Sequence, residues 1–266
     1  MYHRIEFKND YLYFQVAGGG KPIVLLHGFL ESSNMWDDFS VGLRKKFKVV
    51  SIDLPGFGKT KCFDEIHTME FMAECVKTVL EHLRISQCVM VGHSMGGYVS
   101  LAFAEKYPKL LSALCLFHSN ALADTPEAKI NRSRTVAFVR RNHKSFINQF
   151  IPDLFAPNNI DKFKTQIIEL QKDADKITKQ SVIAALEGMK VRTEKLDFLK
   201  KTNLPILFII GKEDPRMKID SLLEQVVIPK YSEVMYLRDC GHMGYIEEKE
   251  MTVRAIKGFA GKYSTD

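Results

Sequence analysis

The feature of the sequence that most constrains the fold is a series of short apolar runs separated by longer segments with helical spacing. The runs predicted as strands are Ile23–Leu26, Val49–Leu54, Cys88–Val91, Leu110–Phe117, Ile206–Ile210 and Val234–Leu237. Several are too continuously apolar to have one face in water, which is typical of a parallel sheet covered on both faces. The alternation of strands and helices predicts an α/β fold with a mostly parallel central sheet.

Helices and a hairpin are predicted around these runs. Thr68–Leu83 has apolar residues at helical spacing, and its first residue suits an N-cap. Gly97–Tyr107 and Met251–Tyr263 also have helical patterns. Arg4–Phe7 and Tyr11–Val16 flank an Asn-Asp pair, so these two runs are expected to form a β-hairpin.

The alternation stops between residues 120 and 200. Helical patterns there are separated by Pro126, Pro152 and Pro157, and no strand is predicted. This segment follows the sixth predicted strand, counted from the hairpin. We predict a helical cap, or lid, of residues 120–200 inserted into a core formed by residues 1–119 and 201–266.

Composition and the N-terminal residues predict a soluble, cytoplasmic protein. The chain has 266 residues, of which 45% are apolar and 26% charged, as is ordinary for a globular protein with a sizeable core. Its first ten residues carry charges where an export signal has an apolar run, and no apolar stretch is long enough to cross a membrane. Five cysteines without C-x-x-C spacing are expected to be free thiols in a reducing compartment.

The net charge of +6 raises the question of nucleic-acid binding. The segment from Ser119 to Leu204 holds 16 Lys or Arg and 10 Asp or Glu, so the whole excess lies there. Basic and acidic residues alternate in it at helical spacings, as on a solvated helix face. No nucleic-acid-binding motif accompanies the charge, so neither a nucleic acid nor a membrane is expected as a partner.

The stretch VGHSMGGYVS contains the motif G-x-S-x-G, with Ser94 between Gly92 and Gly96. Alone, the motif also fits a glycine-rich turn with a small residue at its centre. Here it follows a predicted strand and precedes a predicted helix, which is the setting of a nucleophilic serine in a sharp turn. That setting favours Ser94 as a nucleophile.

Three further loops follow predicted strands and carry the other parts of such a site. His27, Gly28 and Phe29 follow the first strand of the core, where a loop N–H can stabilise an oxyanion; the His27 side chain is expected to orient this loop. A candidate acid is Asp214 or its neighbour Glu213, with Asp220 and Asp239 farther away. His242 follows the last predicted strand and is the candidate general base.

These motifs resemble the α/β-hydrolase fold superfamily, especially its serine esterases, C–C hydrolases and haloperoxidase-like members. The matching stretches are HGF at 27–29, DLPGFGKT at 53–60, GHSMGG at 92–97, GKEDP at 211–215 and GHMGYIE at 241–247. The resemblance covers the whole chain and implies an α/β-hydrolase core with helices on both faces and a helical lid. It implies Ser94 as nucleophile, Asp214 as acid, His242 as base, and the N–H groups of Phe29 and Met95 as oxyanion donors.

A serine at this turn argues against dehalogenases and epoxide hydrolases of similar sequence, which use aspartate. We predict a carboxylesterase-type hydrolase that forms an acyl-enzyme with a small-molecule acyl substrate and needs no metal or organic cofactor. Two alternatives stay open: a C–C bond hydrolase of a diketone, and a slow-turnover ligand-binding or signalling protein. The sequence makes no prediction of oligomeric state.

Five residues are predicted to contact the substrate: Trp36, His118, Phe138, Phe155 and Met243. Aromatic residues of the lid can instead pack the lid against the core. The basic residues of the lid can attract an anionic substrate or form a solvated face, and the solvated face is favoured.

Overall fold

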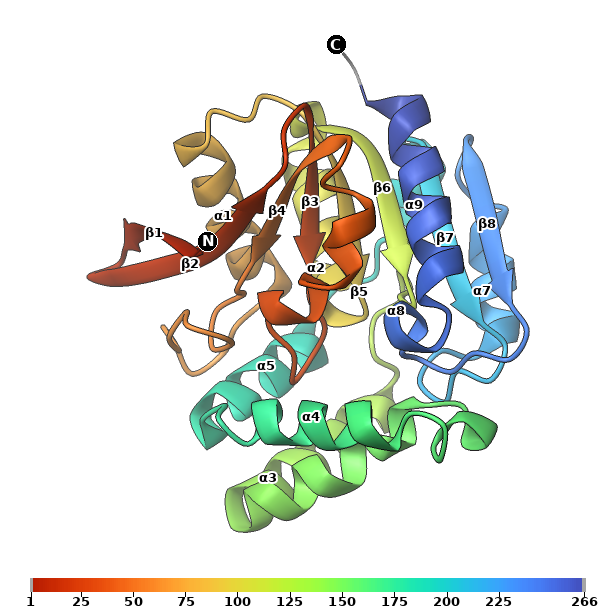
Figure 1. Cartoon of the computed structure of the whole chain (residues 1–266). Coiled ribbons are helices and arrows are strands. Elements are labelled where there is room, and N and C mark those ends of the chain that lie inside the picture. The colour runs from red at the N-terminus through yellow and green to blue at the C-terminus, as the bar shows by residue number, and fades with distance from the viewer. Residues whose placement is uncertain (1, 265–266) are drawn as a thin grey trace.

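A computed structural model describes residues 2–264 and contains an eight-stranded sheet, in the order β1-β2-β4-β3-β5-β6-β7-β8 (Figure 1). The strands are β1 (Tyr2–Phe7), β2 (Asp10–Ala17), β3 (Lys21–Leu26), β4 (Phe47–Ile52), β5 (Cys88–His93), β6 (Leu111–Phe117), β7 (Ile206–Gly211) and β8 (Ser232–Leu237). Strands β1 and β2 form the predicted hairpin, and β2 pairs antiparallel with β4. Every pairing from β4 through β3 to β8 is parallel.

The predicted strands agree with the observed ones to within two residues, and the α/β fold class is confirmed. All residues of β5 and β7 are buried. This explains the unbroken apolar runs, because both faces of the central strands are covered by helices.

The helices that cover the sheet are α1 (Met69–His82), α2 (Met95–Lys106), α7 (Ile219–Val226), α8 (Gly244–Glu247) and α9 (Lys249–Tyr263). Helix α9 crosses one face of the sheet, and α2 packs on β5 and β6 from the other (Figure 1). Thr68 is the N-cap of α1, as predicted, since its side chain accepts a hydrogen bond from the N–H of Phe71. No helix within residues 2–264 is long and apolar enough to span a bilayer.

Between β6 and β7 the chain forms the helices α3 (Pro126–Phe150), α4 (Lys164–Ala174), α5 (Lys179–Val191) and α6 (Leu196–Lys201). Residues 126–201 are called the helical segment below. Each of the three prolines in it begins a helix or a 3₁₀ turn, where the missing N–H costs no hydrogen bond. In Figure 1 the parallel strands β3 and β5–β7 point toward α3, α4 and α5, so these helices lie beyond the carboxyl ends of the parallel strands.

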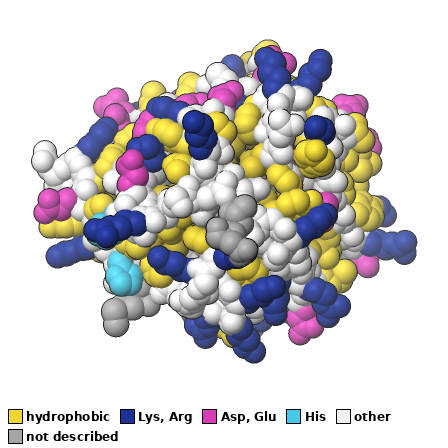
Figure 2. Space-filling view, turned by 90° about the horizontal axis from the view of Figure 1, so that it is seen from above, with side chains coloured by type: hydrophobic (Ala, Val, Ile, Leu, Met, Phe, Trp, Pro, Cys, Tyr) yellow, Lys and Arg dark blue, Asp and Glu magenta, His cyan; other side chains and the backbone are white. Residues whose placement is uncertain are grey.

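The end of the molecule opposite these helices is shown in Figure 2. Lys and Arg side chains are spread there among apolar and acidic ones. The visible face therefore carries mixed charge rather than a concentrated cationic surface.

Helix α5 is anchored to the core at His67. The backbone N–H of His67 donates to the carbonyl oxygen of Ala184 over 3.0 Å. One turn later, a Cβ atom on Gly188 would lie 1.7 Å from the carbonyl oxygen of His67. The two backbones approach so closely that only glycine fits at this position.

We predict that Gly188→Ala destabilises the protein by about 2 kcal/mol or more, because the methyl group forces α5 away from the core. The measurement is the free energy of unfolding in denaturant. Gly258→Ala in α9 is the matched control, since a Cβ there meets nothing within 4 Å. It is expected to be neutral or to stabilise by up to about 1 kcal/mol. Equal effects of the two substitutions would contradict the close packing of α5.

Candidate active site

Ser94 occupies the turn between β5 and α2 in a strained backbone conformation. Its φ is +50° and its ψ −113°, outside the regions that a side chain normally adopts. A Cβ on Gly92 would lie 2.3 Å from the carbonyl oxygen of Gly96, and one on Gly97 would lie 2.3 Å from Ser119 Oγ. The glycines allow the tight turn that presents the Ser94 hydroxyl above the sheet.

A chain of hydrogen bonds joins Ser94, His242 and Asp214. Ser94 Oγ lies 2.8 Å from His242 Nε2, and His242 Nδ1 lies 2.8 Å from Asp214 Oδ2. The three residues follow β5, β8 and β7, and parallel pairing puts the carboxyl ends of these strands at one edge. The arrangement holds an imidazole between a hydroxyl that it can deprotonate and a carboxylate that fixes its tautomer.

Asp214 is the acid that the structure places beside His242. Its Oδ1 accepts the backbone N–H groups of Arg216 and Met217 over 2.8 and 3.0 Å. Burial favours the neutral carboxyl, but the histidines at Oδ2 outweigh it and hold the pKa of Asp214 far below its usual range. Glu213, the local competitor, is exposed and pairs with Lys212.

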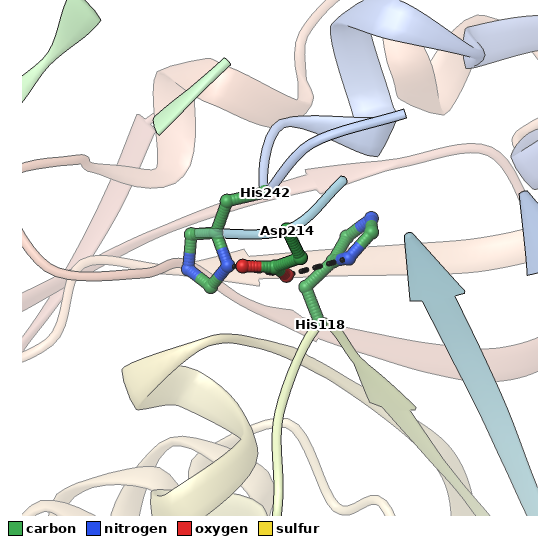
Figure 3. A group of neighbouring side chains, drawn as sticks. All are labelled: His118, Asp214 and His242. Atoms are coloured by element: carbon green, nitrogen blue, oxygen red, sulfur yellow. Dashed lines mark hydrogen bonds and ion pairs between the residues drawn. The ribbon is translucent and has the colours of Figure 1, made fainter. Parts of the chain in front are cut away.

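His118 is not a pocket-lining residue, which corrects the prediction. It is fully buried behind Asp214 and its Nδ1 donates to Asp214 Oδ2 over 3.1 Å, so Asp214 lies between two imidazoles (Figure 3). Burial lowers the pKa of His118, which favours the neutral ring. The potential ligand atoms of His118, Asp214 and His242 lie within 4.8 Å of one another. Since the Asp214 oxygen already accepts N–H groups from both rings, the geometry fits a hydrogen-bonded triad better than a metal centre.

A second buried cluster joins the loop after β3 to Ser94 and His242. Glu31 Oε2 accepts the N–H of Gly28 over 2.7 Å and contacts His93 Nδ1 at 2.9 Å. Glu31 Oε1 accepts the hydroxyl of Tyr245 over 2.8 Å. The other ring nitrogen of His93 lies 2.9 Å from the carbonyl oxygen of His242. The Glu31 carboxylate and the His93 imidazole thus hold together the loops that follow β3, β5 and β8.

The charges of this cluster support each other. Burial raises the pKa of Glu31, but the charge and hydrogen bond of His93 outweigh burial and hold that pKa below its ordinary value. Burial also opposes protonation of His93, but Glu31 and the His242 carbonyl raise the pKa of the ring. The pair is therefore an ion pair in which both ring nitrogens donate.

The cavity next to Ser94 has a volume of about 200 Å³. Its wall combines residues of the core with residues of the helical segment: Phe29, Glu31, His93, Ser94, Tyr98, Arg132, Phe150, Leu154, Leu186, Met189, Arg216, Met217 and His242. Within residues 2–264, the backbone N–H groups of Phe29 and Met95 donate to no other group. Phe29 lines the cavity, and Met95 begins α2 directly after Ser94.

Four more residues predicted to contact substrate lie outside this wall. Trp36 is fully buried, with its ring 5.2 Å from that of Phe39, because so large a side chain fills the core under the loop. Phe138 is 37% exposed on α3, and Phe155 and Met243 are buried in the packing around the site. Trp36, Phe155 and Met243 therefore pack in the hydrophobic core, whereas Phe138 lies at the surface of α3.

Comparisons with known proteins agree with this geometry. The family model described as alpha/beta hydrolase fold matches residues 21–157. A thermophilic esterase from Thermogutta terrifontis, solved with malate bound, is 30% identical with a TM-score of 0.92, over 99% of this chain and 100% of that one.

The chain belongs to the alpha/beta hydrolase fold family.

Two curated relatives show the breadth of that family. The acetyltransferase component of the acetoin cleaving system of Pseudomonas putida is 27% identical over 94% of this chain, which spans only 66% of that protein's length. A 2-hydroxy-6-oxo-6-(2'-aminophenyl)hexa-2,4-dienoic acid hydrolase from Metapseudomonas resinovorans is 23% identical over 92% of this chain and 86% of that protein. The family match and the likeness to the esterase support hydrolase activity for this alpha/beta hydrolase.

Sequence reasoning did not single out Glu31, His93 or Arg216 in this alpha/beta hydrolase. Each had a visible signal: Glu31 is a charge in an otherwise apolar and small-residue loop, and His93 directly precedes Ser94. Arg216 follows the acid by two residues. None of these signals says where the side chain points, so only the folded structure assigns their contacts.

Glu31→Gln should lower the free energy of unfolding by about 3 kcal/mol, because it leaves the protonated His93 buried without its counter-charge. The control is Glu65→Gln, at an exposed glutamate, with an expected effect within about 0.5 kcal/mol. Unfolding in denaturant measures both.

The difference in free energy of unfolding between wild type and Glu31→Gln should depend on pH. The lowered pKa of Glu31 contributes stability above pH 4.5 that is lost as the pH falls further. The raised pKa of His93 contributes stability below pH 6.5 that is lost as the pH rises through that pKa. The difference in free energy of unfolding between wild type and Glu31→Gln should be largest between pH 4.5 and pH 6.5. A gap that is flat across the range would show that the ion pair does not form.

Proposed function

We propose that the protein is a serine hydrolase of the carboxylesterase type, acting through an acyl-enzyme. The observation that carries the proposal is the hydrogen-bonded chain from Ser94 Oγ through His242 to Asp214, with both histidine contacts at 2.8 Å. The likeness to an esterase over nearly the full length of both chains supports it.

In the first half of the reaction, Ser94 Oγ attacks the substrate's carbonyl carbon while its proton passes to His242 Nε2. Asp214 stabilises the resulting imidazolium by its charge and hydrogen bond. The developing oxyanion is placed against the N–H groups of Met95 and Phe29, which have no partner within residues 2–264 and offer the two donors that a tetrahedral intermediate requires. The carbon–oxygen bond then breaks, and His242 delivers the proton to the departing alcohol.

In the second half, His242 takes a proton from a water molecule that attacks the acyl-enzyme. The tetrahedral intermediate collapses, the Ser94 oxygen regains its proton from His242, and the carboxylic acid leaves. Residues 120–200 act as the lid in this scheme, and the rest of the chain as the catalytic core. Side chains of the helical segment, among them Leu154 and Leu186, enclose the acyl group beside Ser94.

A second candidate reaction is cleavage of a C–C bond next to a ketone. The relative from Metapseudomonas resinovorans, which is named as a dienoic acid hydrolase, supports this candidate. An ester and a diketone of matched size separate the two, since the esterase proposal requires the higher kcat/KM on the ester.

Ser94→Ala should lower kcat/KM for a p-nitrophenyl ester by about 10⁴-fold or more, because no nucleophile is left. A fluorophosphonate probe should label wild type on Ser94 and fail to label the variant. His242→Ala should be about as damaging, and the double variant no worse than either single one, because the three groups act as a unit.

Ser145→Ala, at an exposed serine of α3, is the control and should keep wild-type activity. Full activity of Ser94→Ala would refute the assignment. Stoichiometric capture of esters without turnover by wild type would favour a ligand-binding role instead.

A further inference from the structure

The cavity beside Ser94 contains a guanidinium group that has no hydrogen-bond acceptor within residues 2–264. Arg216 lines this cavity, and its guanidinium carbon lies 4.4 Å from the centre of the Phe150 ring. In the part of the chain that the structure describes, the Arg216 side chain forms no ion pair and donates no hydrogen bond. Because Arg216 both lines the cavity and is exposed, it lies where the cavity opens.

The surroundings of Arg216 favour an added anion. Partial burial lowers the pKa of its guanidinium, and nearby Arg132 acts in the same direction. Asp153 and Asp214 oppose this from a distance, without a direct contact to the guanidinium. A carboxylate placed on the free donors would offset the lost hydration and form a bidentate pair.

Arg132 adds a second cation to the same wall. Its Nε and Nη2 donate to Asp124, while its Nη1 lies 3.7 Å from the thioether sulfur of Met189. Asp124 also accepts Arg192 Nη1 over 2.6 Å, so one carboxylate is shared between two guanidiniums. Asp124 carries one negative charge, so it can neutralise only one of the two guanidinium groups.

Two buried carboxylates of the site, Glu31 and Asp214, already accept hydrogen bonds on both of their oxygens. Both oxygens of Glu31 accept hydrogen bonds from the loops around it. Both oxygens of Asp214 are occupied by two backbone N–H groups and two imidazoles. The wall thus offers a substrate free cationic donors, while these two anions are held by groups of the protein.

We propose, building on the proposed function, that the preferred substrate is an ester whose acyl part carries a carboxylate, bound by Arg216 with Arg132 beside it. The acyl group bonded to Ser94 remains in the cavity that Ser94 shares with both arginines, whereas the alcohol leaves. A short dicarboxylic acyl group places one carboxyl carbon on Ser94 and the other carboxylate at Arg216. Arg216 is a specificity residue in this account and takes no part in the proton transfers.

The test compares two p-nitrophenyl esters: the glutarate monoester and its neutral isostere, in which an isopropyl group replaces the carboxylate. Wild type should prefer the glutarate monoester in kcat/KM by roughly ten- to hundredfold, the range for a hydrogen-bonded charge. Arg216→Met should bring that ratio toward one. Arg134→Met is the matched control, because it removes the same charge from an exposed arginine of α3, and it should keep the wild-type ratio.

Protection of wild type from fluorophosphonate labelling keeps the test independent of how well a variant folds. Glutarate should slow labelling of Ser94 at concentrations at which neutral glutaramide has no effect. Equal kcat/KM for the two esters, an unchanged ratio in Arg216→Met, or equal protection by glutarate and glutaramide would overturn the inference and leave the esterase proposal standing. Failure of wild type to hydrolyse either ester or to be labelled would instead refute the proposed function.

Discussion

The site depends on the parallel pairing of β3 and β5 through β8. Parallel register brings the carboxyl ends of these strands to one edge, and the loops that leave them meet there. Ser94, Asp214 and His242 are far apart in the sequence but become hydrogen-bonded neighbours for this reason. The strained turn at Ser94 is tolerated because the glycines around it let β5 and α2 pack without side chains between them.

Two buried carboxylates at this edge of the sheet, Asp214 and Glu31, are each stabilised by neighbouring groups. Asp214 stays ionised under heavy burial because two imidazoles and two backbone N–H groups surround it. Glu31 and His93 stabilise each other's charged forms beneath the loop that carries Phe29. Among residues 2–264 no group accepts a hydrogen bond from the Arg216 side chain, and we expect the proposed substrate to supply that acceptor.

The sequence predicted the elements and the loops of the site better than it predicted the direction of side chains. Burial of one or both faces of a strand or helix determines its pattern of apolar residues. The predicted strands and the three predicted helices of the core therefore match the observed ones to within two residues. Ser94 and His242 were expected to lie together because each follows a strand, and they lie within hydrogen-bond distance. His118 also follows a strand, yet it turns behind Asp214, and Trp36 turns into the core. The orientation of a side chain depends on packing between segments that are distant in the sequence, so a local sequence pattern does not predict it.

The central claim is that Ser94 carries the acyl group during turnover. Rapid acid quenching of the enzyme with a slowly hydrolysed ester, followed by mass spectrometry of its peptides, tests this directly. The acyl-enzyme mechanism predicts an increase equal to the mass of the acyl group on the peptide that contains Ser94, formed as the alcohol is released and lost as the acid appears. Steady turnover with no adduct on that peptide, or with an adduct on another residue, would contradict it.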